Sequence, residues 1–246
     1  MQNRTLQTPI RVLKRHLPIA TPEPLSVVTN FGFDYDWLIN SLYDDERISS
    51  QPKTTGNMIC ELATFFENQN PDAVVTIADR YETLATAVSA SYMNIPLIHT
   101  QGGDQTGSID ESVRHAITKL AHIHFPASEE SKKRIISMGE DSNYVFNDGC
   151  PSIDLIKQSD LTYSKGIFDD AKGIGKEIDF EKPYVVALMH PITTNRKETE
   201  TNIKELLDAS IKISTHNYQV VWLWPNIDSG GGTVSKIIRN YREIKK

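Results

Sequence analysis

Cysteine is scarce in this chain of 246 residues, which contains only Cys60 and Cys150. The two lie far apart and outside any CxxC or Cys/His spacing, so the sequence predicts neither a disulfide framework nor a structural zinc site, and no metal ligands are expected. Isolated thiols of this kind are typical of a cytoplasmic protein, in which they stay reduced.

Long apolar runs and an excess of positive charge are also missing. No stretch approaches the roughly 20 apolar residues that span a bilayer, and the basic N-terminal stretch lacks the apolar segment of a secretion signal. The net charge is −6 and the basic residues are scattered, which argues against binding to nucleic acid or to an anionic membrane surface. We therefore expect a cytoplasmic protein whose partner is a small molecule.

The residues that are present suit a globular α/β protein. The composition is 39% hydrophobic and 24% charged, enough for one large core or two smaller ones. From about residue 57 to 125, short β-branched runs alternate with helical periodicity, which predicts parallel strands joined by right-handed crossovers. The expected strands are 73–77, 96–99, 122–126 and 144–147, and the expected helices are 58–68, 81–92, 108–121 and 128–138.

The second half repeats this rhythm briefly, with strands expected at 184–189 and 220–224 and helices at 197–214 and 233–243. A polar, glycine-bearing stretch at 158–182 is typical of a linker. The sequence thus predicts two Rossmann-like, doubly wound parallel-sheet domains at residues 1–160 and 161–246, the second of them incomplete. Before residue 50 only the segment 25–29 favours a strand.

Polar residues gather directly after the expected strands. In a doubly wound sheet, ligands bind outside the carboxyl ends of the strands. The clusters are rich in Asp, His, Asn and Gly, and they occupy residues 78–80, 99–115, 149–152, 190–194 and 225–228. We expect them to outline a ligand cleft between two domains.

Several of these residues also have a purely structural interpretation. Asp79 is well placed to cap the helix that follows it. Ser108 and Glu111 match a capping box, with Ser at the N-cap and Glu three residues later. Asp110 is favoured near the helix N-terminus by the macrodipole, and Arg114 follows it at the spacing of a local ion pair.

The histidines differ in how strongly they point to a site. His122 and His124 alternate along an expected strand, which favours packing or hydrogen bonding over metal ligation. His190 is the stronger candidate, because a His-Pro sequence at a strand end fixes the imidazole at the rim of the expected cleft. The glycines at 102–103 and 230–232 suit phosphate binding, but isolated glycine pairs are a weak signal.

Five segments carry a resemblance to a known family: 76–82 (TIADRYE), 99–115 (HTQGGDQTGSIDESVRH), 149–154 (GCPSID), 190–194 (HPITT) and 224–228 (WPNID). In order and spacing they resemble the UDP-N-acetylglucosamine 2-epimerase family, especially the hydrolysing branch that feeds sialic-acid-type sugar synthesis. The likeness extends over about residues 57–242. It implies a glycosyltransferase-B-like fold with a nucleotide sugar bound between the two domains.

The resemblance also implies a two-step reaction without a metal or other cofactor. The C2 proton of an N-acetylhexosamine is removed while UDP leaves C1, and water then adds to give a free N-acetylmannosamine-type sugar. By similarity, the catalytic candidates are Asp79, Asp110, Glu111 and His190. The three carboxylates among them are expected to act as acid and base, since a positioned carboxylate suits removal of a weakly acidic proton. The substrate-binding candidates are Arg80, Gln101, Gly103, Asp104, Arg114, His115, Ser152, Thr193, Asn226 and Asp228. Dimers are common in the family, so a homodimer is a further expectation.

The chain departs from the family pattern in places. Gln101 stands where many members have Glu, so it cannot act as a general base, and Asp104 stands where the hydrolysing branch usually has the longer Glu. The family's N-terminal nucleotide-sugar loop and its late uridine-binding segment have no counterpart here. The sequence therefore leaves open a truncated, catalytically inactive nucleotide-sugar-binding homologue, or a fragment without function.

Overall fold

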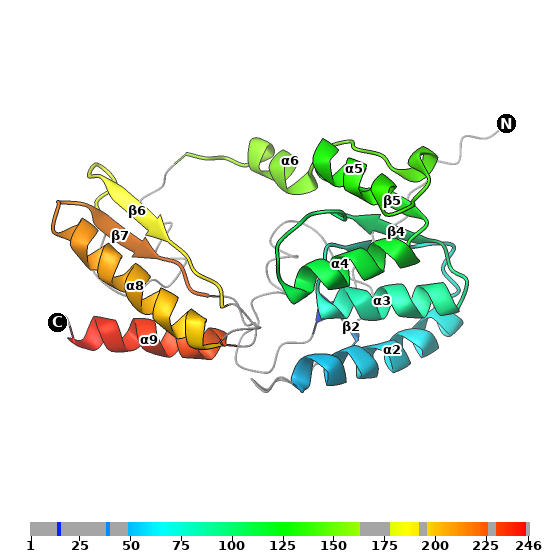
Figure 1. Ribbon diagram of the computed structural model, residues 1–246, viewed down its shortest axis with the longest axis horizontal. Coiled ribbons are helices and arrows are strands. Elements are labelled where there is room, and N and C mark those ends of the chain that lie inside the picture. The colour runs from blue at the N-terminus through cyan, green and yellow to red at the C-terminus, as the bar shows by residue number, and fades with distance from the viewer. Residues whose placement is uncertain are drawn as a thin grey trace. The chain divides into compact units, whose positions relative to one another are not determined.

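The computed structural model describes residues 14–15, 38–39, 49–162, 178–191, 196–225 and 230–244. It divides into two compact units, Met1–Cys150 and Pro151–Lys246. Both units combine parallel strands with helices, as the sequence predicts (Figure 1). In the part of the chain that is described, no helix combines the length and the apolar character needed to cross a bilayer.

The first unit is built on a parallel sheet of three strands in the order β3-β4-β5. The strands are β3 (Val74–Ile77), β4 (Leu97–Thr100) and β5 (Ile123–Phe125). The register aligns Thr76 with His99 and His99 with His124. A separate parallel pair joins β1 (Lys14–Arg15) to β2 (Leu38–Ile39), whereas the expected strand at 25–29 lies outside the described residues.

The helices of the first unit are α2 (Ser50–Gln69), α3 (Tyr81–Tyr92), α4 (Ile109–Leu120) and α5 (Glu129–Ser137), with a short 3-10 turn, η1 (Ser142–Tyr144). Helix α2 packs against α3, and α3 packs against α4 and the sheet. Small alanine side chains such as Ala85 let α3 approach its neighbours closely, and they belong to the same hydrophobic core as Leu62 and Phe66 of α2 and Leu97 of β4. The polar residues that follow β3 and β4 are therefore carried by a well-packed framework.

Two details of the first unit differ from the prediction. Helix α2 begins at Ser50 rather than near Met58. Its first buried residues, Ser50 and Thr54, are polar, so the hydrophobic pattern does not reveal the first turns of the helix. The expected strand at 144–147 is reduced to a single bridge between Val145 and His124, since the η1 turn occupies the residues just before it.

The second unit contains a parallel pair of strands, β6 (Tyr184–Ala187) and β7 (Gln219–Trp222), with the helices α8 (Arg196–Ser214) and α9 (Gly231–Ile244). Its core includes Ile203, Leu207 and Val234. Helix α6 (Pro151–Gln158) was not expected; it begins with a proline, which is favoured at the first helical position. The structure groups α6 with this unit, whereas the sequence assigns residues up to 160 to the first domain.

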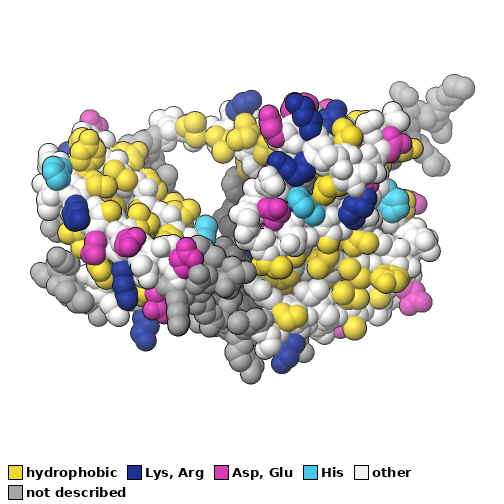
Figure 2. Space-filling view, in the orientation of Figure 1, with side chains coloured by type: hydrophobic (Ala, Val, Ile, Leu, Met, Phe, Trp, Pro, Cys, Tyr) yellow, Lys and Arg dark blue, Asp and Glu magenta, His cyan; other side chains and the backbone are white. Residues whose placement is uncertain are grey.

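Figure 2 shows the charged side chains on the visible face of the first unit. Basic and acidic groups are interspersed there, so their fields partly cancel and do not form one extended patch of a single sign on this face. This distribution agrees with the scattered pattern of Lys and Arg in the sequence.

Candidate functional site

The first element of the site is an ion pair between Asp79 and Arg114. Strand β3 ends at Ile77, and Ala78 then turns with a φ of 57°, in the left-handed region, before Asp79. The N-cap of α3 is Arg80, without a side-chain cap bond, so the interpretation of Asp79 as a helix cap is wrong. The Asp79 carboxylate instead accepts a hydrogen bond from the Arg114 guanidinium of α4.

Arg114 joins three segments of the first unit. It is only 5% exposed, although it is always charged, and burial of a charge is costly unless it is paired. Besides Asp79, it donates to the backbone carbonyl of Asp104 at 2.7 Å. The planar guanidinium thus connects the loop after β3, the loop after β4 and helix α4.

The loop after β4 is tightly packed against α5. Gly103 has a φ of 84°, and a Cβ added there would lie 2.5 Å from the carbonyl oxygen of Ser131, so only glycine fits. The Ser131 hydroxyl donates to the Asp104 carboxylate, and the Arg134 guanidinium donates to the Gly103 carbonyl. Gly103 therefore has a packing role, and Asp104 already has a partner within the protein.

Gln101, at the start of the same loop, is partly buried and also has a left-handed backbone, with a φ of 56°. Its side-chain amide points toward the Cys150 thiol, at 3.9 Å between Nε2 and Sγ. The position that carries Glu in many family members is thus occupied here by a neutral group beside a thiol.

The N-terminus of α4 supplies the other carboxylates. Ser108 is the N-cap, as predicted, and its hydroxyl accepts from the amide of Asp110 at 3.3 Å. Glu111 reaches further back than a capping box requires, because its Oε2 accepts from the amides of Thr106 and Gly107, both at 2.7 Å. These bonds, from Gly107 first and Thr106 second, lower the pKa of Glu111.

The two amides bound by Glu111 are consequently engaged within the loop. His115 lies one turn beyond Glu111 on α4, with 4.0 Å between its Nε2 and the Glu111 Oε1, and its Nδ1 has no partner among the described residues. Asp110 is exposed, and it receives a hydrogen bond from the Ser108 hydroxyl at 3.2 Å. Of the carboxylates on this helix, Asp110 is the more accessible.

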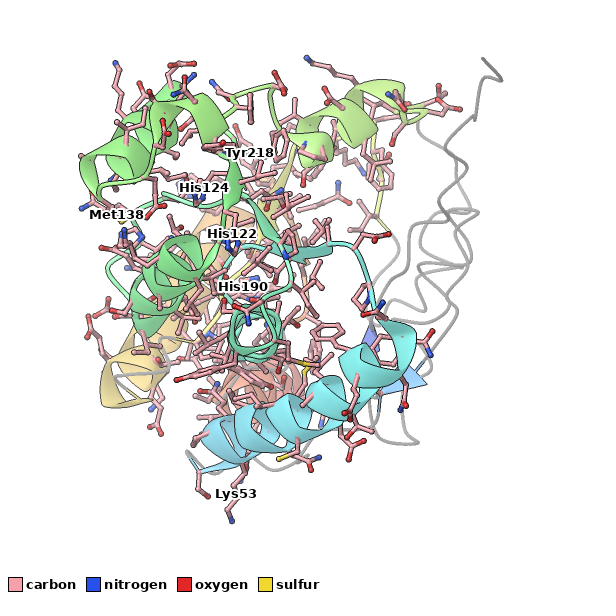
Figure 3. All side chains as sticks on the ribbon, turned by 90° about the vertical axis from the view of Figure 1, so that its right-hand side faces the viewer. Lys53, His122, His124, Met138, His190 and Tyr218 are labelled. Carbon is pink, nitrogen blue, oxygen red and sulfur yellow. The ribbon has the colours of Figure 1, made fainter. Side chains whose placement is uncertain are left out.

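His122, just before β5, and His124 within it make hydrogen-bonding and packing contacts, as the sequence predicts. His122 accepts from the amide of Leu97 at 3.2 Å. His124 is buried, with its Nε2 3.4 Å from the Glu140 carboxylate, and burial lowers its pKa. Figure 3 labels His122 and His124, which lie just before and within β5. Within the described ranges, no group of three or more His, Cys, Asp or Glu side chains is arranged to hold a metal ion.

The candidates of the second unit are only partly described. His190 follows β6 and is exposed, and Ser152 is exposed in the first turn of α6. Thr193, Asn226 and Asp228 lie outside the described residues. The structure thus brings together Asp79, Arg114 and the Asp104 backbone, and their relation to the second-unit candidates stays a prediction. Arg80, the remaining candidate, is the N-cap of α3 and pairs with Glu82 of that helix at 3.2 Å.

Four residues of this network are not among the candidates that the sequence analysis names: His99, Thr118, Ser131 and Arg134. His99 is fully buried, with its Nδ1 3.1 Å from the Thr118 hydroxyl and its Nε2 2.8 Å from the Ala78 carbonyl. One signal is present in the sequence, because His99 alternates with Leu97 on a strand whose inward positions are otherwise apolar. A buried histidine in such a position needs hydrogen-bond partners.

Comparison with known proteins shows the family of the chain. The model of the family described as UDP-N-acetylglucosamine 2-epimerase matches residues 22–246. The chain is 35% identical over 193 residues to the UDP-N,N'-diacetylbacillosamine 2-epimerase (hydrolyzing) of Legionella pneumophila, covering 78% of this chain and 49% of that protein. It is 36% identical over 202 residues to the GDP/UDP-N,N'-diacetylbacillosamine 2-epimerase (hydrolyzing) of Campylobacter jejuni, covering 81% of this chain and 50% of that protein.

Solved structures share the fold. A UDP-GlcNAc 2-epimerase from Neisseria meningitidis, crystallised with UDP-GlcNAc, gives a TM-score of 0.68 at 20% identity, covering 87% of this chain and 58% of that one. A putative UDP-N-acetylglucosamine 2-epimerase from Listeria monocytogenes gives 0.70 at 16% identity, covering 93% and 57%. The chain spans about half the length of the curated relatives it matches. It belongs to the UDP-N-acetylglucosamine 2-epimerase family.

Proposed function

We propose that this chain carries the proton-transfer part of a hydrolysing 2-epimerase that acts on a UDP-activated N-acetylhexosamine. UDP-N-acetylglucosamine and UDP-N,N'-diacetylbacillosamine are the substrates to test, the second because the names of two relatives refer to it. The observation that carries the proposal is the Asp79 carboxylate held against the buried Arg114 guanidinium at the carboxyl end of β3. This is the edge of a parallel sheet at which ligands bind.

The reaction is an elimination followed by a hydration. A carboxylate removes the proton from C2, the C1–O bond breaks, and UDP leaves with the bonding electron pair, so that a double bond forms between C1 and C2. Water then adds its oxygen to C1, and C2 is protonated on the opposite face. The products are UDP and the free, C2-inverted sugar, N-acetylmannosamine when the substrate is UDP-N-acetylglucosamine.

The surroundings of the carboxylates divide these roles. Asp79 and Asp110 are assigned to proton transfer: Asp79 is fixed by Arg114, and Asp110 is accessible in the first turn of α4. Glu111 is assigned to shaping the loop, because its hydrogen bonds to Thr106 and Gly107 favour the ionised form and occupy one carboxylate oxygen. His190, Asn226 and Asp228 are assigned to the sugar and diphosphate on the second-unit side, by the resemblance alone.

The test is to incubate the purified chain with each UDP-sugar and to measure free UDP by chromatography. Running the reaction in D₂O adds a second readout, since a product formed through the unsaturated intermediate carries deuterium at C2. Asp79→Asn keeps the shape of the side chain but removes its basicity, and it is expected to lower turnover by about 10²–10⁴-fold. Glu130→Gln, at an exposed position of α5, makes the same chemical change and serves as the matched control.

The outcomes separate this function from a binding module. UDP release together with C2 deuteration supports the epimerase. Saturable binding of the UDP-sugar to folded protein without UDP release favours a non-catalytic nucleotide-sugar-binding protein. Equal turnover in Asp79→Asn and Glu130→Gln removes Asp79 from the catalytic residues.

A further inference from the structure

His99 occupies a central position that the proposed chemistry does not use. It lies in β4 with no exposed surface, between the end of β3 and helix α4. Its ring has two polar contacts, one to each neighbour: Nε2 to the Ala78 carbonyl at 2.8 Å and Nδ1 to the Thr118 hydroxyl at 3.1 Å. Two hydrogen bonds to different partners fix the orientation of a buried imidazole ring more closely than packing alone would.

The partners determine which nitrogen carries the proton. A carbonyl oxygen can only accept, so Nε2 must be protonated and donate to Ala78. Burial lowers the pKa of His99 to about 4, so the ring is neutral near pH 7 and Nδ1 accepts from the Thr118 hydroxyl. The ring therefore needs one donor and one acceptor at fixed positions.

Each partner of His99 is adjacent to one member of the ion pair. Ala78 immediately precedes Asp79 and has the left-handed φ of 57° that turns the chain toward α4. Thr118 lies one helical turn beyond Arg114, and its single hydroxyl proton is shared between the His99 Nδ1 and the Arg114 carbonyl oxygen, each 3.1 Å from the hydroxyl oxygen. The loop after β4 rests on the same ring, since a Cβ added to Gly102 would be 2.8 Å from the His99 Nδ1.

We propose that His99 is a positioning residue that sets the distance and orientation of Asp79 relative to Arg114, by holding the Ala78 carbonyl with one ring nitrogen and Thr118 with the other. The connection to catalysis rests on the proposed function, in which Asp79 transfers a proton. The geometric part of the proposal concerns the ion pair itself, so it is measured without turnover.

Two substitutions separate the two ends of the ring. His99→Gln places an amide N–H near the position of Nε2 and can still donate to Ala78. His99→Asn places its amide near Nδ1 and is too short to reach that carbonyl. If His99 only fills space, Gln and Asn are expected to have similar effects. If His99 positions Asp79, Gln keeps the hydrogen bond to the Ala78 carbonyl, and with it the position of Asp79, whereas Asn loses both.

The experiment measures how much the Asp79→Asn substitution lowers the urea midpoint of unfolding in three backgrounds: His99, His99→Gln and His99→Asn. The shift is expected to be largest with His99, largely kept with Gln and reduced by more than half with Asn. Equal shifts in all three backgrounds overturn the proposal. If the Asn variant does not fold, Thr118→Val replaces it as the third background, with a reduced shift expected and an unchanged shift again overturning the proposal.

Two further readouts complete the test. Long-range ¹H–¹⁵N spectra of the wild-type chain are expected to show a neutral, Nε2-protonated ring, and an Nδ1-protonated ring overturns the proposal. With UDP release as the assay, His99→Asn is expected to lower kcat on the order of 10- to 100-fold, with a smaller change in KM, and Gln to restore it. If the stability shifts behave as expected but no background releases UDP, the proposed function fails and the positioning of the ion pair stands.

Discussion

Acidification provides a direct test of the neutral, buried state of His99. Burial is the largest cause of its lowered pKa, partly offset by the hydrogen bond to the Ala78 carbonyl. In the unfolded chain the imidazole has its ordinary value of 6.5, against about 4 in the folded protein. Between these values the unfolded state binds the proton and the folded state does not, so stability falls as the pH is lowered through this window.

The size of the effect follows from the two pKa values. Proton uptake by His99 alone is expected to remove about 3 kcal/mol of unfolding free energy between pH 7 and pH 4. This is a large share of the 5–15 kcal/mol or so that is typical of a folded domain. Other groups also titrate in this range, among them His124, whose pKa is lowered by burial and whose contribution has the same sign.

Comparison with His99→Gln isolates the contribution of His99, because Gln does not titrate and the other groups are common to both chains. Urea unfolding is followed by circular dichroism at pH 7, 6, 5 and 4. The wild-type chain is expected to lose about 3 kcal/mol more than the variant over this range. Parallel pH profiles for the two chains, or an NMR titration of the His99 ring with a midpoint near 6.5, refute the reasoning.

Three further predictions concern the loops around the ion pair. Gly103→Ala is expected to lower the unfolding free energy by at least about 2 kcal/mol more than Gly107→Ala, since both glycines have positive φ but only the first is crowded; comparable urea midpoints contradict this. Glu111→Gln weakens the bonds to the loop amides, so hydrogen exchange at Gly107 is expected to accelerate, and unchanged protection contradicts the loop-shaping role. Arg114→Lys keeps the charge but cannot hold both the Asp79 carboxylate and the Asp104 carbonyl of the loop after β4. It is expected to lower the unfolding free energy, measured with urea, by about 1–3 kcal/mol. A smaller loss argues that one of the two contacts suffices.

The fold was predictable wherever the burial pattern followed hydrophobicity. Helix α3 has the expected bounds, Tyr81–Tyr92, because its alanine-rich sequence favours a helix and also suits close packing. The start of α2 was not predictable in this way, since Ser50 and Thr54 are buried although they are polar. The reduction of the expected strand at 144–147 to one bridge depends on the η1 turn, which the hydrophobic pattern does not reveal.

The sequence predicts where polar residues gather after the strands, but not the contacts that these residues make. Sequence spacing favours local partners, and it suggested Asp110 as the partner of Arg114 and a capping role for Asp79. The structure pairs Asp79 with Arg114 across a long sequence separation, because parallel strands bring their carboxyl ends to one edge of the sheet. His99 was not named as a candidate because its two partners, the Ala78 carbonyl and the Thr118 hydroxyl, are distant in the sequence and meet it only in the folded chain.

Contacts within the first unit connect the Asp79–Arg114 ion pair to the packing of the loop after β4. Gly102 rests on the His99 ring, Gly103 on the Ser131 carbonyl, and the Asp104 carbonyl on Arg114. The groups that fix the ion pair are therefore the same groups that pack the loop, so a substitution to Ala removes stability and geometry together. Replacements of similar shape that change one hydrogen bond at a time, such as His99→Gln against His99→Asn, are needed to distinguish a residue that aims Asp79 from one that only keeps the loop folded.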